Sequence, residues 1–208
     1  MLTPDYPIGC QRILISDDYL ESLNRDNIHV ETRPIARIAP DGVVTEDGAH
    51  HPADALILAT GFRATSFLEP LRVTGRDGRD LHEDWRDGAE AYLGVAVAGY
   101  PNLFLLYGPN TNLGHNSIIY MVEAQVEYVR KLIERLLKKD LKAIEVKQAV
   151  QDRYNEKIQQ EMHDTVWEEE CGSWYKTESG KVTNNWPTWT FRYRKVMRRP
   201  KWGDYEVA

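Results

Sequence analysis

One stretch constrains the fold of this chain more than any other: residues 101–117, where an apolar run leads through a polar turn into a helix. Leu103 to Tyr107 is apolar and long enough for a buried strand, and residues 108–114 are rich in Gly, Pro and Asn. A long amphipathic helix is expected from about Asn116 to Lys139, because apolar residues recur there at spacings of three and four. The spacing therefore predicts a strand, a turn and a helix start in direct succession.

A helix start that follows a glycine-bearing turn can bind an anion or an electron-rich heterocycle. The first backbone N–H groups of a helix have no partner inside it, and the helix dipole adds partial positive charge there. Gly108 and Gly114 permit close backbone approach or a positive φ. A plain strand-to-helix connection, capped by Asn and Ser, explains the same residues. Spacing alone favours this second interpretation, because the glycines do not follow G-x-G-x-x-G.

The charge and composition of the chain disfavour some classes of function. The 208 residues are 42% hydrophobic and 28% charged, with a net charge of −6, which disfavours a general role in binding nucleic acid or a membrane surface. The most apolar window, residues 92–108, is interrupted by glycines and a proline, so a membrane span is not expected. Cys10 and Cys171 form no metal-binding or C-x-x-C spacing. They suit a reducing, cytoplasmic location, with a disulfide between them left open.

The N-terminal part of the chain predicts several short strands. The expected strands cover Ile28–Thr32, Ile35–Ile38 and Val43–Val44, with turns at Asp41-Gly42 and at Asp47-Gly48. The continuous apolar run Ala55–Ala59 is typical of a strand buried on both faces of a parallel sheet. Such a strand needs neighbouring strands and covering helices, and this sequence offers few before it. The run is therefore expected to expose apolar surface in the isolated chain.

The C-terminal part predicts a second helix and an aromatic, basic tail. The second helix is expected from Val146 to about Glu169, and Trp85 is expected to anchor the irregular region before residue 92. From Cys171 onward, Trp and Tyr residues alternate with Arg and Lys. Such a tail could stack on a nucleotide, or its aromatics could pack on the body while its charges face water. The acidic chain favours packing.

Motifs of several enzyme classes are absent from the sequence. It has no G-x-G-x-x-G, no phosphate-binding loop with G-K-[ST], no H-E-x-x-H and no G-x-S-x-G. Of the histidines, only His115 lies in the candidate site, while His50 and His51 are expected in a solvated turn. Glu127 and Lys131 are best explained as an ion pair on one helix face. The residues alone therefore predict neither a catalytic group nor a metal site.

Several segments resemble one enzyme family. Asp54-Ala-Leu-Ile-Leu-Ala-Thr-Gly-Phe62 resembles the A-T-G strand of flavoproteins with two dinucleotide-binding domains. The block from Leu93 to Asn110, with Gly-Tyr-Pro-Asn-Leu-Phe and Gly-Pro-Asn, is similar to Baeyer–Villiger and related class B flavin-dependent monooxygenases. The segments Cys171-Gly-Ser-Trp-Tyr175 and Asn185-Trp-Pro187 resemble the C-terminus of the same family.

The resemblance implies an α/β fold, a partial Rossmann-like FAD/NAD(P) flavoprotein whose N-terminal half is missing from this sequence. Residues 1–62 would be the C-terminal part of an NADPH-binding domain. Residues 63–208 would be the C-terminal part of an FAD-binding domain with an aromatic, basic tail. The implied activity is monooxygenation with FAD, NADPH and O₂, in which a peroxyflavin inserts one oxygen atom into a ketone or heteroatom substrate. The isolated chain is expected to be inactive, and the missing N-terminal half is an expected partner.

The resemblance also implies which residues would lie at the cofactors. The turn and the helix start would pass the flavin, Thr60 and Gly61 would lie between the two domains, and Trp174 would face the nicotinamide nucleotide or pack. The predicted cofactor-binding residues are Thr60, Gly61, Gly108, Pro109, Asn110, Thr111, Asn112, Gly114, His115, Asn116, Ser117 and Trp174. No catalytic residue is assigned.

Two other interpretations stay open from the sequence. The chain could be a piece without activity of its own, or a binding module. A pyridine-nucleotide disulfide reductase shares the A-T-G strand but is disfavoured, since no redox-active cysteine pair is present.

Overall fold

A computed structural model of the chain describes residues 2–114, 116–169 and 174–208. These residues form two compact units. Unit 1 contains Leu14–Phe62 and the residues up to Asp5, and unit 2 contains Tyr6–Ile13 and Arg63–Ala208. The boundary after Phe62 is where the chain leaves its exposed apolar run, and the short segment Tyr6–Ile13 joins unit 2 instead of unit 1.

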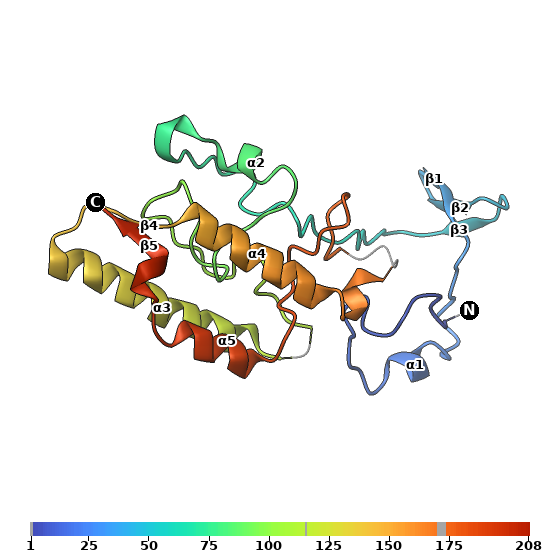
Figure 1. The fold of residues 1–208 in the computed structure, drawn as a ribbon. Coiled ribbons are helices and arrows are strands. Elements are labelled where there is room, and N and C mark those ends of the chain that lie inside the picture. Colours follow the sequence, from blue (N-terminus) through green and yellow to red (C-terminus); the bar gives the residue numbers. More distant parts are fainter. Residues whose placement is uncertain (1, 115, 170–173) are drawn as a thin grey trace. The chain divides into compact units, whose positions relative to one another are not determined.

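Unit 1 consists of a short helix and a small antiparallel sheet (Figure 1). The helix is α1 (Tyr19–Ser22), and the strands are β1 (Ile35–Ala39), β2 (Gly42–Thr45) and β3 (His50–Pro52). Ala39 pairs with Gly42, and Val44 pairs with His50. Gly42 has a φ of 155°, and a Cβ at this position would overlap the carbonyl oxygen of His51. The pairing of β2 with β3 therefore requires glycine at position 42.

Some predictions for unit 1 are confirmed and others are wrong. The strands at Ile35–Ile38 and Val43–Val44 and the turn at Asp47-Gly48 are present, but the first hairpin turn lies one residue earlier than expected. His50 and His51 lie in β3 and not in a turn, and residues 28–32 form no strand. Residues 55–59 also form no strand, and Ile57 is 93% exposed. A run of this kind pairs only with neighbouring strands, which the described residues do not supply.

Unit 2 is mainly helical, with one small antiparallel sheet. Its α-helices are α2 (Leu81–Asp84), α3 (Ile118–Lys139), α4 (Gln148–Met162) and α5 (Thr190–Met197). Short 3₁₀ turns are η1 (Arg76–Gly78), η2 (Val166–Glu168) and η3 (Trp202–Asp204). Strand β4 (Ile144–Val146) pairs with β5 (Tyr205–Val207), and this pairing ties the C-terminus to the segment between α3 and α4.

Helix α3 confirms the main helix prediction. Its buried face presents Met121, Ala124, Tyr128 and Leu132, at the spacings expected of an amphipathic helix. The helix ends at Lys139 and is followed by the C-cap residue Asp140, whose backbone is left-handed (φ 52°). Basic residues of the last turn complement the negative end of the helix dipole.

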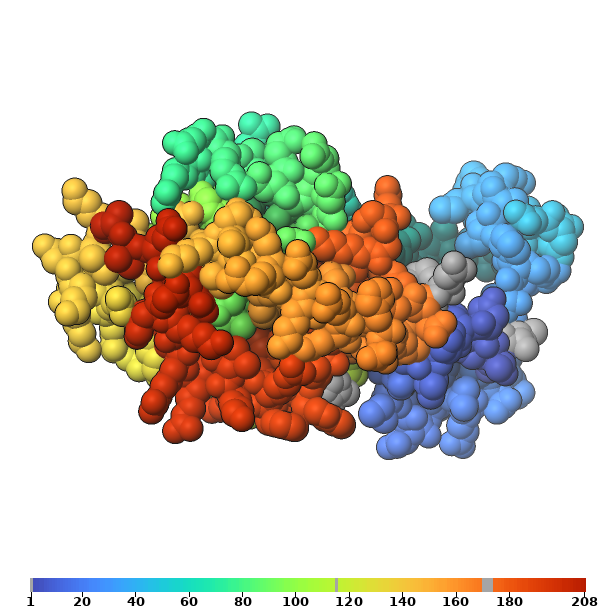
Figure 2. Space-filling view, viewed as in Figure 1, coloured from blue at the N-terminus to red at the C-terminus, as the bar shows by residue number. Residues whose placement is uncertain are grey.

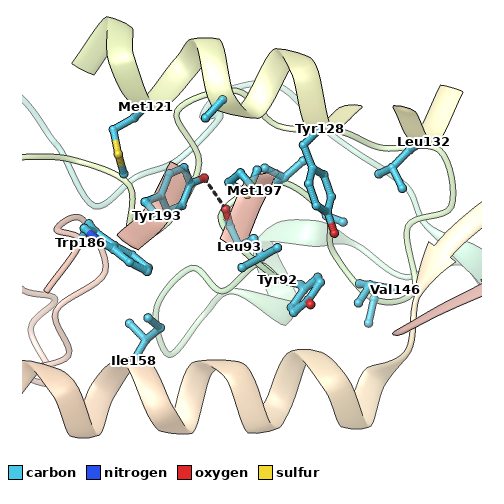
Figure 3. Close-up of a cluster of buried hydrophobic side chains, with 14 of the residues drawn as sticks. Tyr92, Leu93, Met121, Tyr128, Leu132, Val146, Ile158, Trp186, Tyr193 and Met197 are labelled. Carbon is cyan, nitrogen blue, oxygen red and sulfur yellow. Dashed lines mark hydrogen bonds between the residues drawn. The ribbon is translucent and has the colours of Figure 1, made fainter. Parts of the chain in front are cut away.

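The main core of unit 2 lies between α3 and α4 (Figure 3). Tyr92 and Leu93 lie between the two helices, and α5 contributes Tyr193, whose hydroxyl donates to the Leu93 carbonyl oxygen at 2.7 Å. A smaller core cluster contains Trp85, whose indole N–H donates to the Glu90 carbonyl oxygen at 3.0 Å. The anchoring role predicted for Trp85 is therefore confirmed.

Three predictions for unit 2 need correction. Leu103–Tyr107 is not a buried strand: only Phe104 forms a bridge, to Ala96, and Tyr107 is 46% exposed. The second helix begins at Gln148, because Val146 is taken up by β4, and it ends at Met162. The tail is not extended but folds into α5, η3 and β5, and space filling shows it along one face of unit 2 (Figure 2).

The tail divides its aromatic residues between core and surface. Tyr175, Trp186, Tyr193 and Tyr205 are buried, as expected for aromatics that pack on the body, whereas Trp189 and Phe191 are exposed. Cys10 is buried and disulfide-bonded, and Cys171 lies outside the described residues. The reducing, cytoplasmic location predicted from the cysteines stays a prediction.

Candidate functional site

The polar turn before α3 is largely buried. Asn110, Thr111 and Asn112 are 2%, 0% and 7% exposed, and Gly108 and Pro109 are buried with them. Buried polar groups need hydrogen-bond partners, so the partners of these side chains decide what the turn can do. Most of those partners belong to the segment 182–186 in the tail.

Asn110 holds the turn to this segment through its side chain and its backbone. Its amide group donates to the carbonyl oxygens of Val182, at 2.8 Å, and Asn185, at 3.2 Å. Its backbone N–H donates to the Thr183 carbonyl oxygen at 2.7 Å. Asn110 has a φ of 55°, a left-handed conformation that Asn adopts more readily than most residues. The amide nitrogen of Asn110 thus donates two hydrogen bonds within the chain.

Asn112 makes the second half of this contact. Its amide group donates to the side-chain oxygen of Asn185 at 2.8 Å, and its own side-chain oxygen accepts from the Tyr107 hydroxyl at 2.8 Å. The backbone N–H of Trp186 donates to the Asn112 carbonyl oxygen at 2.8 Å. We call the contact between residues 107–112 and 182–186 the turn–tail clamp. It joins the Gly-Pro-Asn and Asn-Trp-Pro segments, which are far apart in sequence.

Gly108 lies against the backbone of Gly94. A Cβ at Gly108 would overlap the Gly94 carbonyl oxygen, while φ at Gly108 is not in the left-handed region. Gly94 has a φ of 67°, and a Cβ at this position would overlap the Thr111 side chain and the Pro109 carbonyl oxygen. The close approach of these two loops therefore explains why position 108 requires glycine. The Gly94 carbonyl oxygen occupies the place that a Cβ at Gly108 would take.

The start of α3 is the exposed part of the candidate site. Gly114, Asn116 and Ser117 are exposed, and His115 lies outside the described residues. Ser117 is the N-cap, and its side chain makes no capping hydrogen bond. The Asn116 side chain accepts from the Ser117 backbone N–H at 2.7 Å and donates to the Thr190 hydroxyl at 3.2 Å. The first turn of α3 thus keeps the partial positive charge of a helix start next to solvent.

The remaining predicted residues lie elsewhere. Trp174 is 42% exposed and stacks on Tyr175, with ring centroids 4.9 Å apart. Thr60 and Gly61 belong to unit 1, are exposed, and Gly61 has a φ of 82°. Within unit 2, the predicted residues of the turn and of the helix start therefore lie together as one candidate site. Residues 108–112 form its buried half, and Gly114, Asn116 and Ser117 form its exposed half.

The sequence prediction missed two residues that hold this region. Gln125, on the buried face of α3, accepts from the Tyr107 backbone N–H at 2.8 Å and donates to the Tyr193 hydroxyl at 2.9 Å. Asn185 completes the turn–tail clamp. Gln125 could have been found as a polar residue on the buried face of the helix, whereas Asn185 was noted only as part of the segment Asn185-Trp-Pro187, without a role. Burial raises the pKa of Tyr107 and that of Tyr193 above the ordinary value of a tyrosine, so both hydroxyls stay protonated and can donate.

None of the helices in the part of the chain that the structure describes is long and apolar enough to cross a membrane. The described residues also contain no group of three or more His, Cys, Asp or Glu side chains placed to hold a metal ion.

Comparison with known proteins places this geometry among flavin enzymes, although no family model matches the chain. An FAD-binding monooxygenase of Aspergillus niger, ktnD, is 46% identical over 98% of this chain and 34% of its own length. A Baeyer–Villiger monooxygenase of Pseudomonas aeruginosa is 44% identical over 95% of this chain and 38% of its own length. The chain thus spans little more than a third of these relatives.

Solved structures of monooxygenases are also similar to this chain. The structure of an oxidized steroid monooxygenase bound to NADP superposes with a TM-score of 0.86 at 28% identity, over 98% of this chain and 40% of that one. A structure of OTEMO in complex with FAD and NADP gives a TM-score of 0.86 at 28% identity, over 98% of this chain and 39% of that one.

Proposed function

We propose a function from one premise: this chain corresponds to a C-terminal portion of Baeyer–Villiger and FAD-binding monooxygenases. The enzyme that contains it would use FAD, NADPH and O₂ to insert one oxygen atom into a ketone or heteroatom substrate. The observation that carries this proposal is the match along 98% of the chain at 46% identity to an FAD-binding monooxygenase. The isolated chain would have no activity of its own.

The residues present fit a flavin at the start of α3 only. The side chains of residues 109–112 are buried, and those of Asn110, Thr111 and Asn112 bond within the chain, so they would not contact the cofactor. Gly108 is closed off by the Gly94 carbonyl oxygen. The role of residues 108–112 would be to fix the entry of the chain into α3. Gly114, Asn116 and Ser117 are exposed and would lie along the cofactor.

FAD, when bound, supplies the redox chemistry, because it accepts a hydride from NADPH and activates O₂. The backbone N–H groups of the first turn of α3 would face the ring edge where negative charge gathers on reduction. Their dipoles are held in place by the helix and by the turn–tail clamp, so they need no rearrangement to stabilise that charge. This is the contribution we assign to residues 108–117.

The nicotinamide cofactor would involve other parts of the chain. We assign unit 1 to the C-terminal part of an NADPH-binding domain and unit 2 to the C-terminal part of a Rossmann-like FAD-binding domain. Thr60 and Gly61 would lie where the two domains meet, and the half-exposed ring of Trp174 would face the nucleotide. A cytoplasmic location stays a prediction.

The apolar surface of α3 favours a partner that completes the fold. Ile119, Val126, Ile133 and Leu137 form an exposed stripe, with Ile119 67% and Leu137 77% exposed. Their spacings of seven, seven and four place them on one side of the helix, away from the buried face. We assign this stripe to the N-terminal part of the longer polypeptide, since the relatives extend well beyond the length matched here.

The proposal is tested by joining this chain to the N-terminal portion of the Aspergillus niger relative in one polypeptide. The joined protein should oxidise NADPH faster when a ketone is added and should convert the ketone to an ester. The isolated chain, as the control, should do neither. A joined protein that holds FAD and is reduced by NADPH but oxygenates neither ketones, sulfides nor amines would contradict the proposed activity. Reduction of a redox disulfide substrate would favour the disulfide reductase alternative instead.

A further inference from the structure

A chain of buried hydrogen bonds links the start of the polar turn to the tail and to a second loop. The Tyr107 backbone N–H donates to the Gln125 side-chain oxygen at 2.8 Å, and the Gln125 amide nitrogen donates to the Tyr193 hydroxyl at 2.9 Å. The Tyr193 hydroxyl donates in turn to the Leu93 carbonyl oxygen at 2.7 Å (Figure 3). The side chains of Gln125 and Tyr193 are fully buried. We call these three bonds the Gln125–Tyr193 relay.

The direction of every bond in this relay is fixed by its two ends. A backbone N–H can only donate, so the Gln125 oxygen must face Tyr107 and the Gln125 nitrogen must face Tyr193. The Leu93 carbonyl oxygen can only accept, so the Tyr193 proton points to it and the Tyr193 oxygen accepts from Gln125. Removal of the Tyr193 hydroxyl would therefore leave two buried groups without a partner, one on each side of it.

The relay ends at two residues with unusual backbone conformations. Leu93 and Tyr107 have φ values of 56° and 61°, in the left-handed region that such residues rarely adopt. Conformations of this kind persist only where the surrounding structure holds them, and they gather at sites that bind a ligand. The two ends also meet directly, because the Gly94 carbonyl oxygen lies against Gly108. The relay and this contact form a closed ring that fixes where the chain enters the turn.

Helix α5 supports the other end of the turn as well. Thr190 lies three residues before Tyr193, both are buried, and the Thr190 hydroxyl accepts from the Asn116 side chain at 3.2 Å. One short helix of the tail thus holds the backbone at Tyr107, before the turn, and the side chain of Asn116, at the start of α3. The position of α5 therefore sets both ends of the turn.

We propose that Gln125 and Tyr193 are positioning residues for the flavin: by holding Tyr107 in its left-handed conformation, they set the path that brings the first turn of α3 to the cofactor. This inference rests on the flavin site proposed above. Neither side chain can touch the cofactor, since both are buried, so each acts through the backbone that it holds. Without the relay, the turn should enter α3 along more than one path, and the N–H groups at the helix start would lose their alignment with the charge that gathers on reduction.

The same substitution at two buried tyrosines tests this role in the joined protein. Tyr193→Phe breaks the relay, whereas Tyr128→Phe removes another buried hydroxyl of the same core, which lies 2.9 Å from the Tyr205 hydroxyl. In Tyr193→Phe, the binding of reduced FAD should weaken about tenfold more than that of oxidised FAD, which lowers the two-electron reduction potential by about 30 mV. Tyr128→Phe should keep the potential of the parent, although it also loses stability. Spectroelectrochemical titration of the three proteins measures the potential.

Hydrogen exchange tests the relay without the flavin. In the 208-residue chain, followed by mass spectrometry, the segment 104–108 should exchange about tenfold faster in Tyr193→Phe than in Tyr128→Phe, because the Tyr107 N–H loses its fixed acceptor. Equal potentials or equal exchange rates in the two variants would overturn the positioning role and leave the flavin site in place. A joined parent protein that binds no FAD would overturn the proposed function, and this inference with it. Gln125→Met, which removes the middle of the relay, replaces Tyr193→Phe if that variant does not fold.

Discussion

Asn110, Asn112 and Asn185 show how single polar residues can be essential to a candidate site without touching a ligand. Their amide groups join the turn before α3 to the tail through buried hydrogen bonds of 2.8–3.2 Å. Removing one partner of such a pair leaves the other buried and unsatisfied, which is more costly than losing the bond itself. The polar residues of the turn are therefore explained by their hydrogen bonds within the chain, without a ligand.

Gly108→Ala is predicted to destabilise unit 2 in the absence of any cofactor. The added Cβ would overlap the Gly94 carbonyl oxygen, and one of the two loops must shift, at a cost of about 1–3 kcal/mol in the free energy of unfolding. Chemical denaturation followed by circular dichroism measures this cost. Gly203→Ala is the control, since a Cβ there meets nothing within 4 Å and should change stability little. Equal stability of the two variants would contradict the assigned contact.

Asn112 and Asn185 are predicted to be energetically coupled. A double-mutant cycle with Asn112→Ala and Asn185→Ala should give a coupling free energy of about 1–2 kcal/mol, because the two amide groups lie 2.8 Å apart in a buried position. The pair Asn112 and Asn102 serves as the control, since Asn102 bonds to Lys142 and Ile144 instead. If the coupling free energy between Asn112 and Asn185 is as small as that between Asn112 and Asn102, the turn–tail clamp is not formed in solution.

Among the elements, α3 has two faces with different roles. One face carries Met121, Tyr128 and Leu132 into the core, while the opposite side exposes the stripe that we assign to the missing part of the polypeptide. Its N-terminus lies at the exposed half of the candidate site, and its middle carries Gln125, which fixes the preceding loop. The helix thus connects the core, the turn and the proposed interface.

Ser117→Asp tests the orientation of α3 in the completed enzyme. A negative charge at the N-cap would repel the anionic reduced flavin, so the reduction potential should fall by roughly 10–20 mV and reduction by NADPH should slow. Spectroelectrochemical titration measures the potential. Ser117→Asn is the matched control, because it changes size but not charge, and its potential should match that of the parent. An unchanged potential in Ser117→Asp would mean that the helix points elsewhere.

The ion pairs of Glu127 on α3 predict a pH dependence. The Arg130 side chain, followed by Lys131, lowers the pKa of Glu127 from 4.5 to about 2. A depressed pKa in the folded state contributes stability above pH 4.5, and this contribution is lost as the pH falls toward 2. The stability difference between parent and Glu127→Gln should therefore shrink across that window, measured by urea denaturation at each pH. A difference that is constant with pH would contradict the pairing.

Elements that depend on local periodicity could be predicted from the sequence, whereas elements that depend on distant partners could not. Helix α3 could be predicted because a helix makes its backbone hydrogen bonds within itself. The apolar spacing that predicted it runs through Ile119, Val126 and Ile133, which are exposed, whereas the buried face carries Met121, Tyr128 and Leu132. Leu103–Tyr107 and Ala55–Ala59 were predicted as strands from their apolar character, but a strand also needs a neighbour. Gln125 and Asn185 were missed for the same reason, since their partners lie far away in sequence.

At the scale of the whole molecule, the chain combines a well-packed core with apolar surface that has no cover within either unit. The core of unit 2 joins α3, α4 and α5. Ile57 and Phe62 in unit 1 are 93% and 88% exposed, and the α3 stripe is exposed in unit 2. Contiguous exposed apolar surface marks an interface. We propose that the N-terminal part of a longer polypeptide supplies this cover, because the chain spans little more than a third of the relatives' length.

Flavin content of the purified protein tests most directly the claim that this chain supplies only part of an FAD site. The measurement is flavin absorbance per polypeptide, made on the isolated chain and on the same chain joined to the N-terminal portion of the Aspergillus niger relative. We predict that the isolated chain carries no stoichiometric flavin and that the joined protein is yellow and saturated with it. Full occupancy in the isolated chain, or none in a joined protein that folds, would contradict the account.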